Sequence, residues 1–248
     1  MLAIVSAMPP ELAALKALMP TDQITTVAGR RFHQGQLAGQ DVVLALTGIG
    51  KVAAAATAAV LCQHFQASAL LFTGVAGGLG AGVKVGDVVV ADALLQHDLD
   101  VSPLFPRWVV PGAGKDRFAP DPHWSERLRQ AAAAVLAQPE PELAQGLAAF
   151  GLHAPQCHQG LIISGDRFVS TTAESQALRA VLPDALAVEM EGAAVAQVCA
   201  DFDRPFAVLR TVSDRADDHA HVDFERFLAD VAAEMARDIV LKALRTPA

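Results

Sequence analysis

The sequence has 248 residues, 52% of them hydrophobic, and a formal net charge of −8. This length predicts one α/β domain whose core needs no disulfide or metal. The acidic balance and the lack of a Lys/Arg cluster argue against a nucleic-acid or anionic-membrane surface, and a small ligand that is neutral or cationic suits such a protein better.

The N-terminal segment and the cysteines indicate where the protein works. Residues 1–15 lack the basic segment of a signal peptide, and the most apolar run, 52–62, is too short to span a bilayer. Cys62, Cys157 and Cys199 are scattered without ligand-type spacing, which is typical of reduced thiols. We therefore expect a soluble cytoplasmic protein that does not bind a membrane.

Short apolar runs that end in glycine or polar residues alternate with helical patterns along the chain. In chain order, strands are predicted at 2–8, 30–48 (a hairpin turning near Ala38-Gly39-Gln40), 69–74, 85–98, 160–169, 185–190 and 205–214. Helices are predicted at 9–19, 51–65, 123–137 and 222–244. A surface connection is predicted at 139–146, and a proline-rich functional or interface loop at 100–122.

This alternation predicts an α/β fold, a single domain spanning 1–248 with a mixed central β-sheet flanked by α-helices. In such sheets, ligands bind where strands end. The segments that follow the predicted strands are therefore the candidate site. They are residues 8–11, 47–51, 73–80, 164–169, 189–191 and 213–218.

Two glycine-containing turns resemble nucleotide-binding motifs but fail their patterns. The stretch TGIGK, 47–51, has Ala45 where a phosphate loop needs glycine, and Val52 where it needs Ser or Thr. It is predicted to be a tight strand-to-helix turn whose helix N-terminus can face an anion or a water. The stretch TGVAGGLGAG, 73–82, has the wrong spacing for a dinucleotide fingerprint, and its glycines fit either sharp turns or a closely approaching ligand.

The stretch DDHAHVD, 217–223, contains side chains that can bind metals. Asp217, His219 and His221 could be ligands, but no distant Cys or His set completes a recognisable site. A solvated helix start is favoured, and no metal is expected.

Four acids stand at or near predicted strand ends. Asp214, after Ser213, fits either the N-cap of a following helix or a catalytic carboxylate, and Glu11 could simply be a first-turn helix acid. Glu189 and Glu191 would share a face if the strand continued, but a helix starting near Glu191 would turn them apart. Buried acids need donors, which are either sugar hydroxyls or backbone amides.

These pieces, in this order, resemble the 5′-methylthioadenosine/S-adenosylhomocysteine nucleosidases within the purine nucleoside phosphorylase superfamily. The matching stretches are AIVSAMPPEL, LTGIGKVAAA, TGVAGGLGAGVKVGDVVVAD, GLIISGDRFV, AVEMEGAAVAQVC and VLRTVSDRADD. They reach from the first strand to the start of the last helix. The stretches VEMEGAAVAQVC and RTVSDRAD together are specific for the family.

The resemblance implies a set of catalytic residues. Asp214 matches the general acid that protonates the purine at N7, and Ser213 matches the residue that orients it. Glu11 matches the group that positions or activates the attacking water, with Arg210 nearby as a helper. An acid at the leaving base relieves the negative charge that develops there.

The resemblance also implies a nucleoside-binding set. Glu191 matches the carboxylate that accepts hydrogen bonds from the ribose 2′- and 3′-hydroxyls, and Met190 matches the residue packed under the sugar. Phe168 should stack on adenine, while the main chain of Val169 reads its edge. The remaining wall residues are Ile49, Val75, Ala76 and Gly77. Glu189 is assigned to holding the loop.

The sequence departs from the family pattern in three places. Val75 stands where many nucleosidases have Ser, and Pro9 and Pro10 precede Glu11 where acids are common. The loop DVSPLFPRWVVPGAG, 100–114, is unlike that of the better-known bacterial enzymes. In the family this region crosses a dimer interface and helps to close the neighbour's pocket. The residues expected to do so here are Leu104, Phe105 and Trp108.

The resemblance therefore implies a homodimeric enzyme of nucleoside catabolism and methionine salvage. It would hydrolyse methylthioadenosine and S-adenosylhomocysteine to adenine and a 5′-substituted ribose, without metal or cofactor. One alternative is another superfamily member, either a phosphorylase or a nucleosidase for a nucleoside such as futalosine. Another class of alternative is a non-catalytic nucleoside-binding protein, against which the intact Glu11, Glu191 and Asp214 argue.

Overall fold

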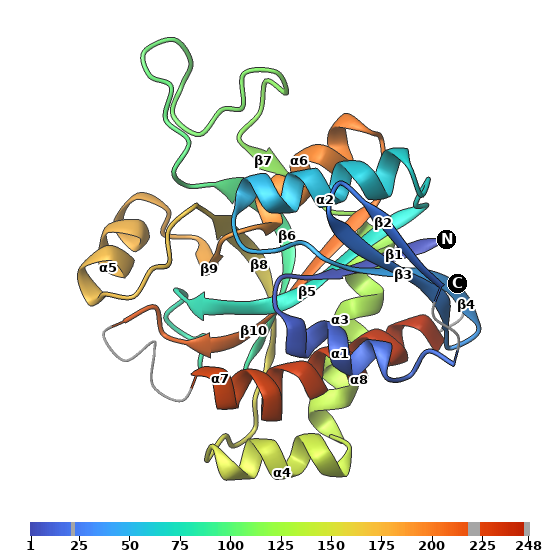
Figure 1. The fold of residues 1–248 in the computed structure, drawn as a ribbon. Helices are drawn as coiled ribbons and strands as arrows, with labels where there is room; N and C mark the ends of the chain where they lie inside the picture. Colours follow the sequence, from blue (N-terminus) through green and yellow to red (C-terminus); the bar gives the residue numbers. More distant parts are fainter. Residues whose placement is uncertain (21–22, 218–223, 246–248) are drawn as a thin grey trace.

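The computed structural model describes residues 1–20, 23–217 and 224–245, and within them ten strands form one mixed sheet flanked by helices (Figure 1). The strands are β1 Leu2–Ser6, β2 Gln23–Val27, β3 Arg30–Leu37, β4 Gln40–Leu46, β5 Ala69–Gly78, β6 Val88–Gln96, β7 Arg117–Phe118, β8 Cys157–Ser164, β9 Ala185–Glu189 and β10 Phe206–Asp214. The helices are α1 Pro9–Lys16, α2 Lys51–Gln63, α3 Pro122–Ala137, α4 Pro141–Ala149, α5 Thr172–Val181, α6 Gly192–Asp201, α7 Phe224–Phe227, the π-helical η1 Leu228–Ala232 and α8 Ala233–Arg245. The predicted fold class is confirmed.

The sheet brings together strand ends that are far apart in the sequence. Strand β10 pairs in parallel with β5 and antiparallel with β6, so β10, β6, β8, β9 and β5 close into a ring. Strands β1, β4, β3 and β2 extend the sheet from β5. Because β1 is parallel to both β4 and β5, the carboxyl ends of β1, β4, β5 and β10 lie next to one another. The register sets Asp214 opposite Gly77, and Ser6 opposite Thr73.

Both faces of the sheet are buried, as the alternation along β1 illustrates. Leu2 and Ile4 pack into one core with α1, α3 and α8, whereas Ala3 and Val5 pack into a second core with α2 and α6. Figure 1 shows these two groups of helices on opposite sides of the strands. Helices α2 and α6 begin a few residues after β4 and β9. Their N-termini therefore face the edge where the strand ends meet.

The predicted hairpin is confirmed, and its turn has the expected geometry. Strands β3 and β4 pair antiparallel across Ala38-Gly39, which have positive φ angles of 50° and 78°. Two-residue hairpin turns of this kind require positive φ at both positions. The loop predicted at 100–122 is irregular from 100 to 116, whereas Arg117–Phe118 form the short strand β7, which was not predicted. Residues 97–116, between β6 and β7, form an arm that projects from the body of the molecule (Figure 1, green).

The prediction for residues 139–146 is wrong, because Pro141–Ala149 form helix α4. Pro141 lies in its first turn, where proline needs no amide partner, and Leu143 and Leu147 are buried one helical turn apart. The strand β2 and the helix α5 were not predicted. The predicted C-terminal helix is confirmed, because the chain is helical without a break from Phe224 to Arg245. It contains the π-helical segment Leu228–Ala232, which was not predicted and lies where Gly146 of α4 packs against the backbone of Asp230.

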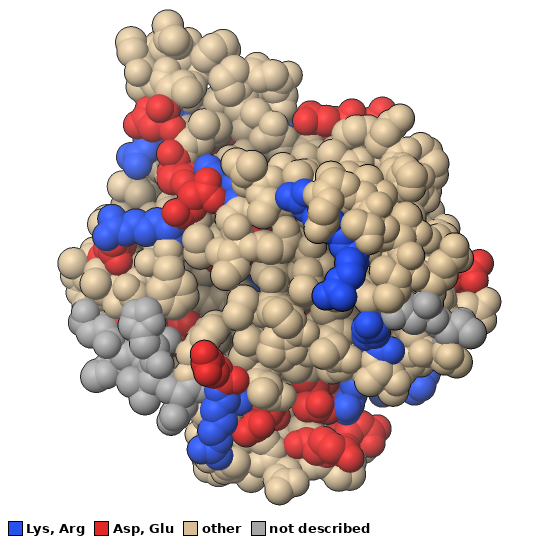
Figure 2. Space-filling view, in the orientation of Figure 1, with Lys and Arg blue, Asp and Glu red and all other residues tan. Residues whose placement is uncertain are grey.

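The lengths of the described helices and the charges on one face of the molecule bear on the kind of partner that the protein can have. Among the described residues, no helix is both long and apolar enough to cross a bilayer. On the described part of the face in Figure 2, basic and acidic side chains are interspersed on a mostly uncharged surface.

Candidate active site

One cavity lies where the strand ends meet, and each of the six segments that follow the predicted strands contributes to it. Its lining residues are Ala7, Met8, Glu11, Ile49, Gly74, Val75, Ala76, Gly77, Phe168, Glu189, Met190, Glu191, Arg210, Ser213, Asp214 and Phe224. Each of the four residues predicted to be catalytic lines it, and so does each predicted substrate-binding residue except Val169. Val169 is buried in an apolar cluster with Leu79 and Ile163. The role of its main chain stays a prediction.

The three candidate residues on the arm do not line the cavity of their own chain. Leu104 and Phe105 are 83% and 42% exposed. Trp108 is half-buried, and its indole N–H donates to the carbonyl oxygen of His97 at 3.0 Å, so it also anchors the base of the arm. Their contribution to a partner's pocket stays a prediction.

Asp214 ends β10 with both carboxylate oxygens held by neighbouring groups. Ser213 Oγ donates to Oδ2 at 2.7 Å, and the backbone N–H of Ala216 donates to Oδ1 at 2.7 Å. A carboxylate bound to the amide two residues on forms an Asx turn, which is not the helix N-cap that the sequence left open. The side chain is nearly buried and lies beside the glycine-rich end of β5.

Glu11 is completely buried in the first turn of α1. Its Oε2 accepts from the backbone N–H of Met8 at 3.3 Å, whereas Oε1 has no hydrogen-bond partner among the described residues. Burial raises the pKa of Glu11 to about 7, and the nearby Glu191 adds to the rise, whereas Arg210 and the Met8 amide oppose it. Glu11 is therefore poised to exchange a proton near neutral pH.

Glu191 is the N-cap residue of α6 and lines the same cavity. Its Oε1 accepts from the backbone N–H of Gly50 at 2.8 Å. Burial and then the charge of Glu189 raise the pKa of Glu191 to about 7, and the Gly50 hydrogen bond and Arg210 counteract them. The start of α2, which was expected to face an anion or a water, thus faces the carboxylate of Glu191.

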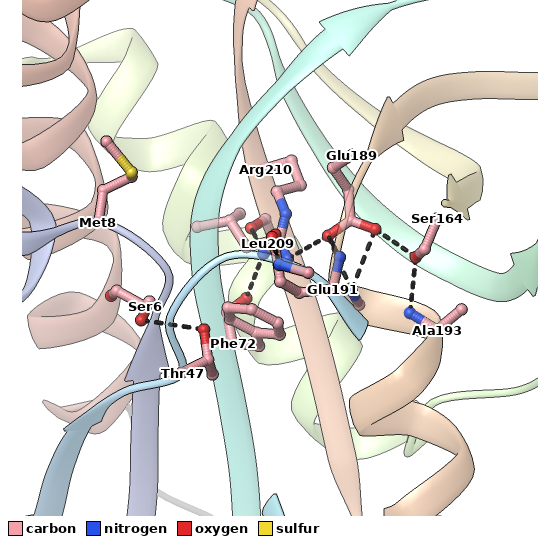
Figure 3. Close-up of polar contacts among 12 residues, drawn as sticks. Ser6, Met8, Thr47, Phe72, Ser164, Glu189, Glu191, Ala193, Leu209 and Arg210 are labelled. Carbon is pink, nitrogen blue, oxygen red and sulfur yellow. Dashed lines mark hydrogen bonds and ion pairs between the residues drawn. The ribbon is translucent and has the colours of Figure 1, made fainter. Parts of the chain in front are cut away.

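Glu189 and Glu191 point to different partners, because β9 ends at Glu189 and α6 begins at Gly192 (Figure 3). Glu189 binds Arg210 Nη2 at 2.6 Å and accepts from the backbone N–H groups of Glu191 and Gly192 and from Ser164 Oγ. It therefore holds the loop, as predicted from the resemblance. Arg210 also donates to two backbone carbonyls, so most of its donors are occupied by the fold.

The two raised pKa values predict a stability that depends on pH. Between the ordinary glutamate pKa of 4.5 and about 7, folded Glu11 and Glu191 retain protons that the unfolded chain has lost. Their contribution to the free energy of unfolding therefore falls as pH rises through this window, by about 1.4 kcal/mol per unit of pKa shift. Urea unfolding at pH 5 and pH 8 should show a smaller fall for Glu11→Gln than for the wild type. The control Glu140→Gln, at an exposed position, should lose as much unfolding free energy between pH 5 and pH 8 as the wild type. An equal loss in Glu11→Gln would contradict the raised pKa of Glu11.

The cavity has wall residues that were not predicted as site residues. Met8 and Gly74 lie in the predicted strand-end segments, so the position of those segments was the available signal. Phe224 starts α7, with its ring centroid 6.5 Å from that of Phe168. Nothing in the local pattern around Phe224 marked it, because only the packing of the C-terminal helix onto α1 and α3 brings it to the cavity.

The described residues contain no group of three or more His, Cys, Asp and Glu side chains that could hold a metal ion. Of the metal-capable stretch at 217–223, His219 and His221 lie outside the described residues.

Comparison with known proteins identifies the family to which the chain belongs. The pattern of the family described as the phosphorylase superfamily matches residues 1–245. The 5′-methylthioadenosine/S-adenosylhomocysteine nucleosidase of Geobacillus kaustophilus is 37% identical over 98% of this chain and 95% of its own length, and that of Anoxybacillus flavithermus is 38% identical over 93% and 92%. The crystal structure of the Neisseria meningitidis nucleosidase with methylthio-immucillin-A superimposes with a TM-score of 0.85, at 36% identity and 98% coverage of both chains. The chain therefore belongs to the 5′-methylthioadenosine/S-adenosylhomocysteine nucleosidases of the phosphorylase superfamily.

Proposed function

We propose that this chain hydrolyses the N-glycosidic bond of methylthioadenosine and S-adenosylhomocysteine, releasing adenine and the 5′-substituted ribose. The observation that carries the proposal is the convergence of Asp214, Glu11 and Glu191 on one cavity with an aromatic side chain, Phe168, in its wall. Membership of the nucleosidase family supports the substrate class.

The leaving base needs a proton, and Asp214 is the proposed donor. As the C1′–N9 bond breaks, its electron pair goes to the purine, and the proton of Asp214 goes to N7. Ser213 and the Ala216 amide fix the carboxyl group from two sides, which supports a defined direction for that transfer.

The sugar and the water need carboxylates on the other side of the cavity. Glu191 is proposed to bind the ribose hydroxyls and to stabilise the positive charge that develops on the ring. The backbone N–H of Gly50 holds Oε1 of Glu191 in place for this role. Water attacks C1′ and gives a proton to Glu11, whose unpaired Oε1 suits that role. Since protonated Glu11 cannot accept that proton and protonated Glu191 cannot stabilise the positive charge, kcat/KM is expected to fall as pH drops through about 7, with both pKa values contributing to this acid limb.

A phosphorylase is disfavoured by the charges around the cavity. Phosphate needs cationic donors. Among the described lining residues, Arg210 supplies the basic side chain, and it is paired with Glu189 at 2.6 Å. Glu11 and Glu191 would repel an anion.

The assay that tests this function is release of adenine in phosphate-free buffer. Methylthioadenosine is expected to yield free adenine without phosphate, and the rates with S-adenosylhomocysteine and adenosine would rank the 5′-substituents. Release that requires phosphate would instead identify a phosphorylase. Binding without release under either condition would favour a non-catalytic nucleoside-binding protein.

The working form is proposed to be a homodimer. Exposed apolar side chains at the start of α2 and on the arm support this proposal. Ile49, just before α2, is 60% exposed, Val52 in its first turn is 81% exposed, and Leu104 on the arm is 83% exposed. In this dimer the arm of one chain would close the cavity of the other. Sedimentation equilibrium should give a two-chain species, and Val52→Glu should shift it toward the monomer. A monomeric wild type with full activity would contradict the proposal.

From the proposed substrates we infer a role in methionine salvage, and we propose that the protein works in the cytoplasm. The three cysteines are free thiols, as expected in a reducing compartment.

A further inference from the structure

Three charged residues outside the cavity form a closed set of hydrogen bonds at its rim. Lys51 Nζ lies 2.6 Å from Asp98 Oδ1. The other oxygen of Asp98, Oδ2, accepts from the backbone N–H of Asp166 at 2.8 Å. Asp166 Oδ1 in turn accepts from the backbone N–H of Lys51 at 2.7 Å. These contacts join the start of α2, the base of the arm and the loop after β8.

Helix α2 lacks an N-cap side chain of its own. Its N-cap residue is Gly50, and its first turn contains no acid. Asp166 supplies the missing cap from another element, because its carboxylate accepts the first amide of the helix. The fit is close, since a Cβ added to Gly50 would lie 3.1 Å from Asp166 Oδ1, and the φ of Gly50 is +93°.

The amide next to this capped one belongs to the candidate active site. Gly50 N–H donates to Glu191 Oε1 at 2.8 Å, and Lys51 N–H donates to Asp166 at 2.7 Å. The two amides belong to successive peptide units that meet at the Cα of Gly50, so their relative direction is set by the φ and ψ angles of Gly50, whose φ is +93°. Asp166 and Glu191 thus hold the peptide units on the two sides of Gly50, and releasing the Lys51 amide would free the φ and ψ angles of Gly50 that aim its own N–H at Glu191.

We infer that Asp166 is a positioning residue for the proposed reaction: it caps α2 in trans and so holds the Gly50 amide against Glu191. The inference rests on the proposed function. Asp98 supports the cap by binding the Asp166 amide and the Lys51 side chain together. Asp166 also lies two residues before Phe168, so its bond to the Lys51 amide ties the aromatic wall of the cavity to α2.

Removing the carboxylate should be detected at Glu191. Misplaced contacts at a reacting centre cost up to about 100-fold, and Asp166→Ala is expected to lower kcat/KM for methylthioadenosine by roughly 10- to 100-fold. The Gly50 hydrogen bond lowers the pKa of Glu191 against the effects of burial and of Glu189. Weakening this hydrogen bond should raise the pKa of Glu191, so the acid limb of the kcat/KM profile should shift to higher pH by about half a pH unit or more. Glu189, Arg210 and Glu11, which face Glu191, are unchanged in this variant.

The experiment measures kcat/KM from pH 5 to pH 9 for the wild type, Asp166→Ala, Asp166→Asn and Asp184→Ala. Asn keeps an acceptor oxygen for the Lys51 amide, so it should stay within about threefold of the wild type with the acid limb nearly in place. Asp184 is the matched control, since it accepts from Arg117 at 2.7 Å on the exposed surface. Its variant should keep the wild-type profile.

Two results would overturn the inference. One is an Asp166→Ala variant within twofold of the wild type with an unmoved acid limb. The other is an Asp166→Asn variant as impaired as Asp166→Ala, with the acid limb unmoved in both variants, because that pattern reports stability alone. If Asp166→Ala does not fold, Asp166→Ser shortens the side chain and takes its place with the same expectations. A wild type that releases no adenine would refute the proposed function, and this inference would fall with it.

Discussion

Replacing Asp214 with asparagine is expected to lower kcat for methylthioadenosine by roughly 10²- to 10⁴-fold, the usual contribution of a positioned general acid. The amide has the shape of the carboxyl group but cannot release a proton to the purine. Its oxygen can still accept from the Ala216 amide at the position of Oδ1, so the turn that carries it should survive. Nucleoside binding should therefore remain largely intact while turnover is lost.

Two measurements on the same samples separate these effects. Adenine release gives kcat, and titration calorimetry with methylthioadenosine gives the dissociation constant. Asp201→Asn, an exposed acid at the end of α6, serves as the control and should match the wild type in both. Turnover that survives unchanged in Asp214→Asn would show the mechanism to be wrong. A loss of binding equal to the loss of turnover would show that Asp214 binds the substrate rather than driving the chemistry.

Much of the candidate site could be predicted because each part of it follows a strand. The apolar runs marked the strands, and parallel strands place their carboxyl ends at one edge, so residues as distant as Glu11 and Asp214 were expected to converge. The alternatives that local patterns left open needed the structure. Whether Glu189 and Glu191 share a face depends on where β9 ends, and the start of α6 at Gly192 turned them apart.

The parts that escaped prediction depend on packing rather than on local pattern. Helix α4 is short and begins with a proline between two acids, so its sequence suits a surface turn equally well. What makes it a helix is the burial of Leu143 and Leu147 against the C-terminal helix. Phe224 reaches the cavity in the same way, through the docking of α7 and α8 onto the sheet. Likewise, the partner of Arg210 could not be read from spacing, because Glu189 lies 21 residues away on another strand.

That Arg210–Glu189 pair carries the second large prediction. Glu189→Gln is expected to reduce the free energy of unfolding by about 3–5 kcal/mol, the cost of leaving a buried charge without its counter-charge. The two side chains are 1% and 2% exposed, so water cannot solvate the guanidinium that remains. The new amide group would also present donors to Ser164 Oγ and to the N–H groups of Glu191 and Gly192, which now donate to Glu189.

Urea unfolding, read from both midpoint and slope, measures this loss. The matched control is Glu126→Gln, which breaks an Arg–Glu pair of the same 2.6 Å length whose side chains are 43% and 46% exposed, and it should leave stability unchanged. The double variant Glu189→Leu with Arg210→Met removes both charges, so it should regain part of the stability that Glu189→Gln loses. If Glu189→Gln were as stable as its exposed counterpart, the pair would not be holding the loop. The order of Glu191 at the start of α6 would then have to come from the Gly50 amide and the packing of α6 alone.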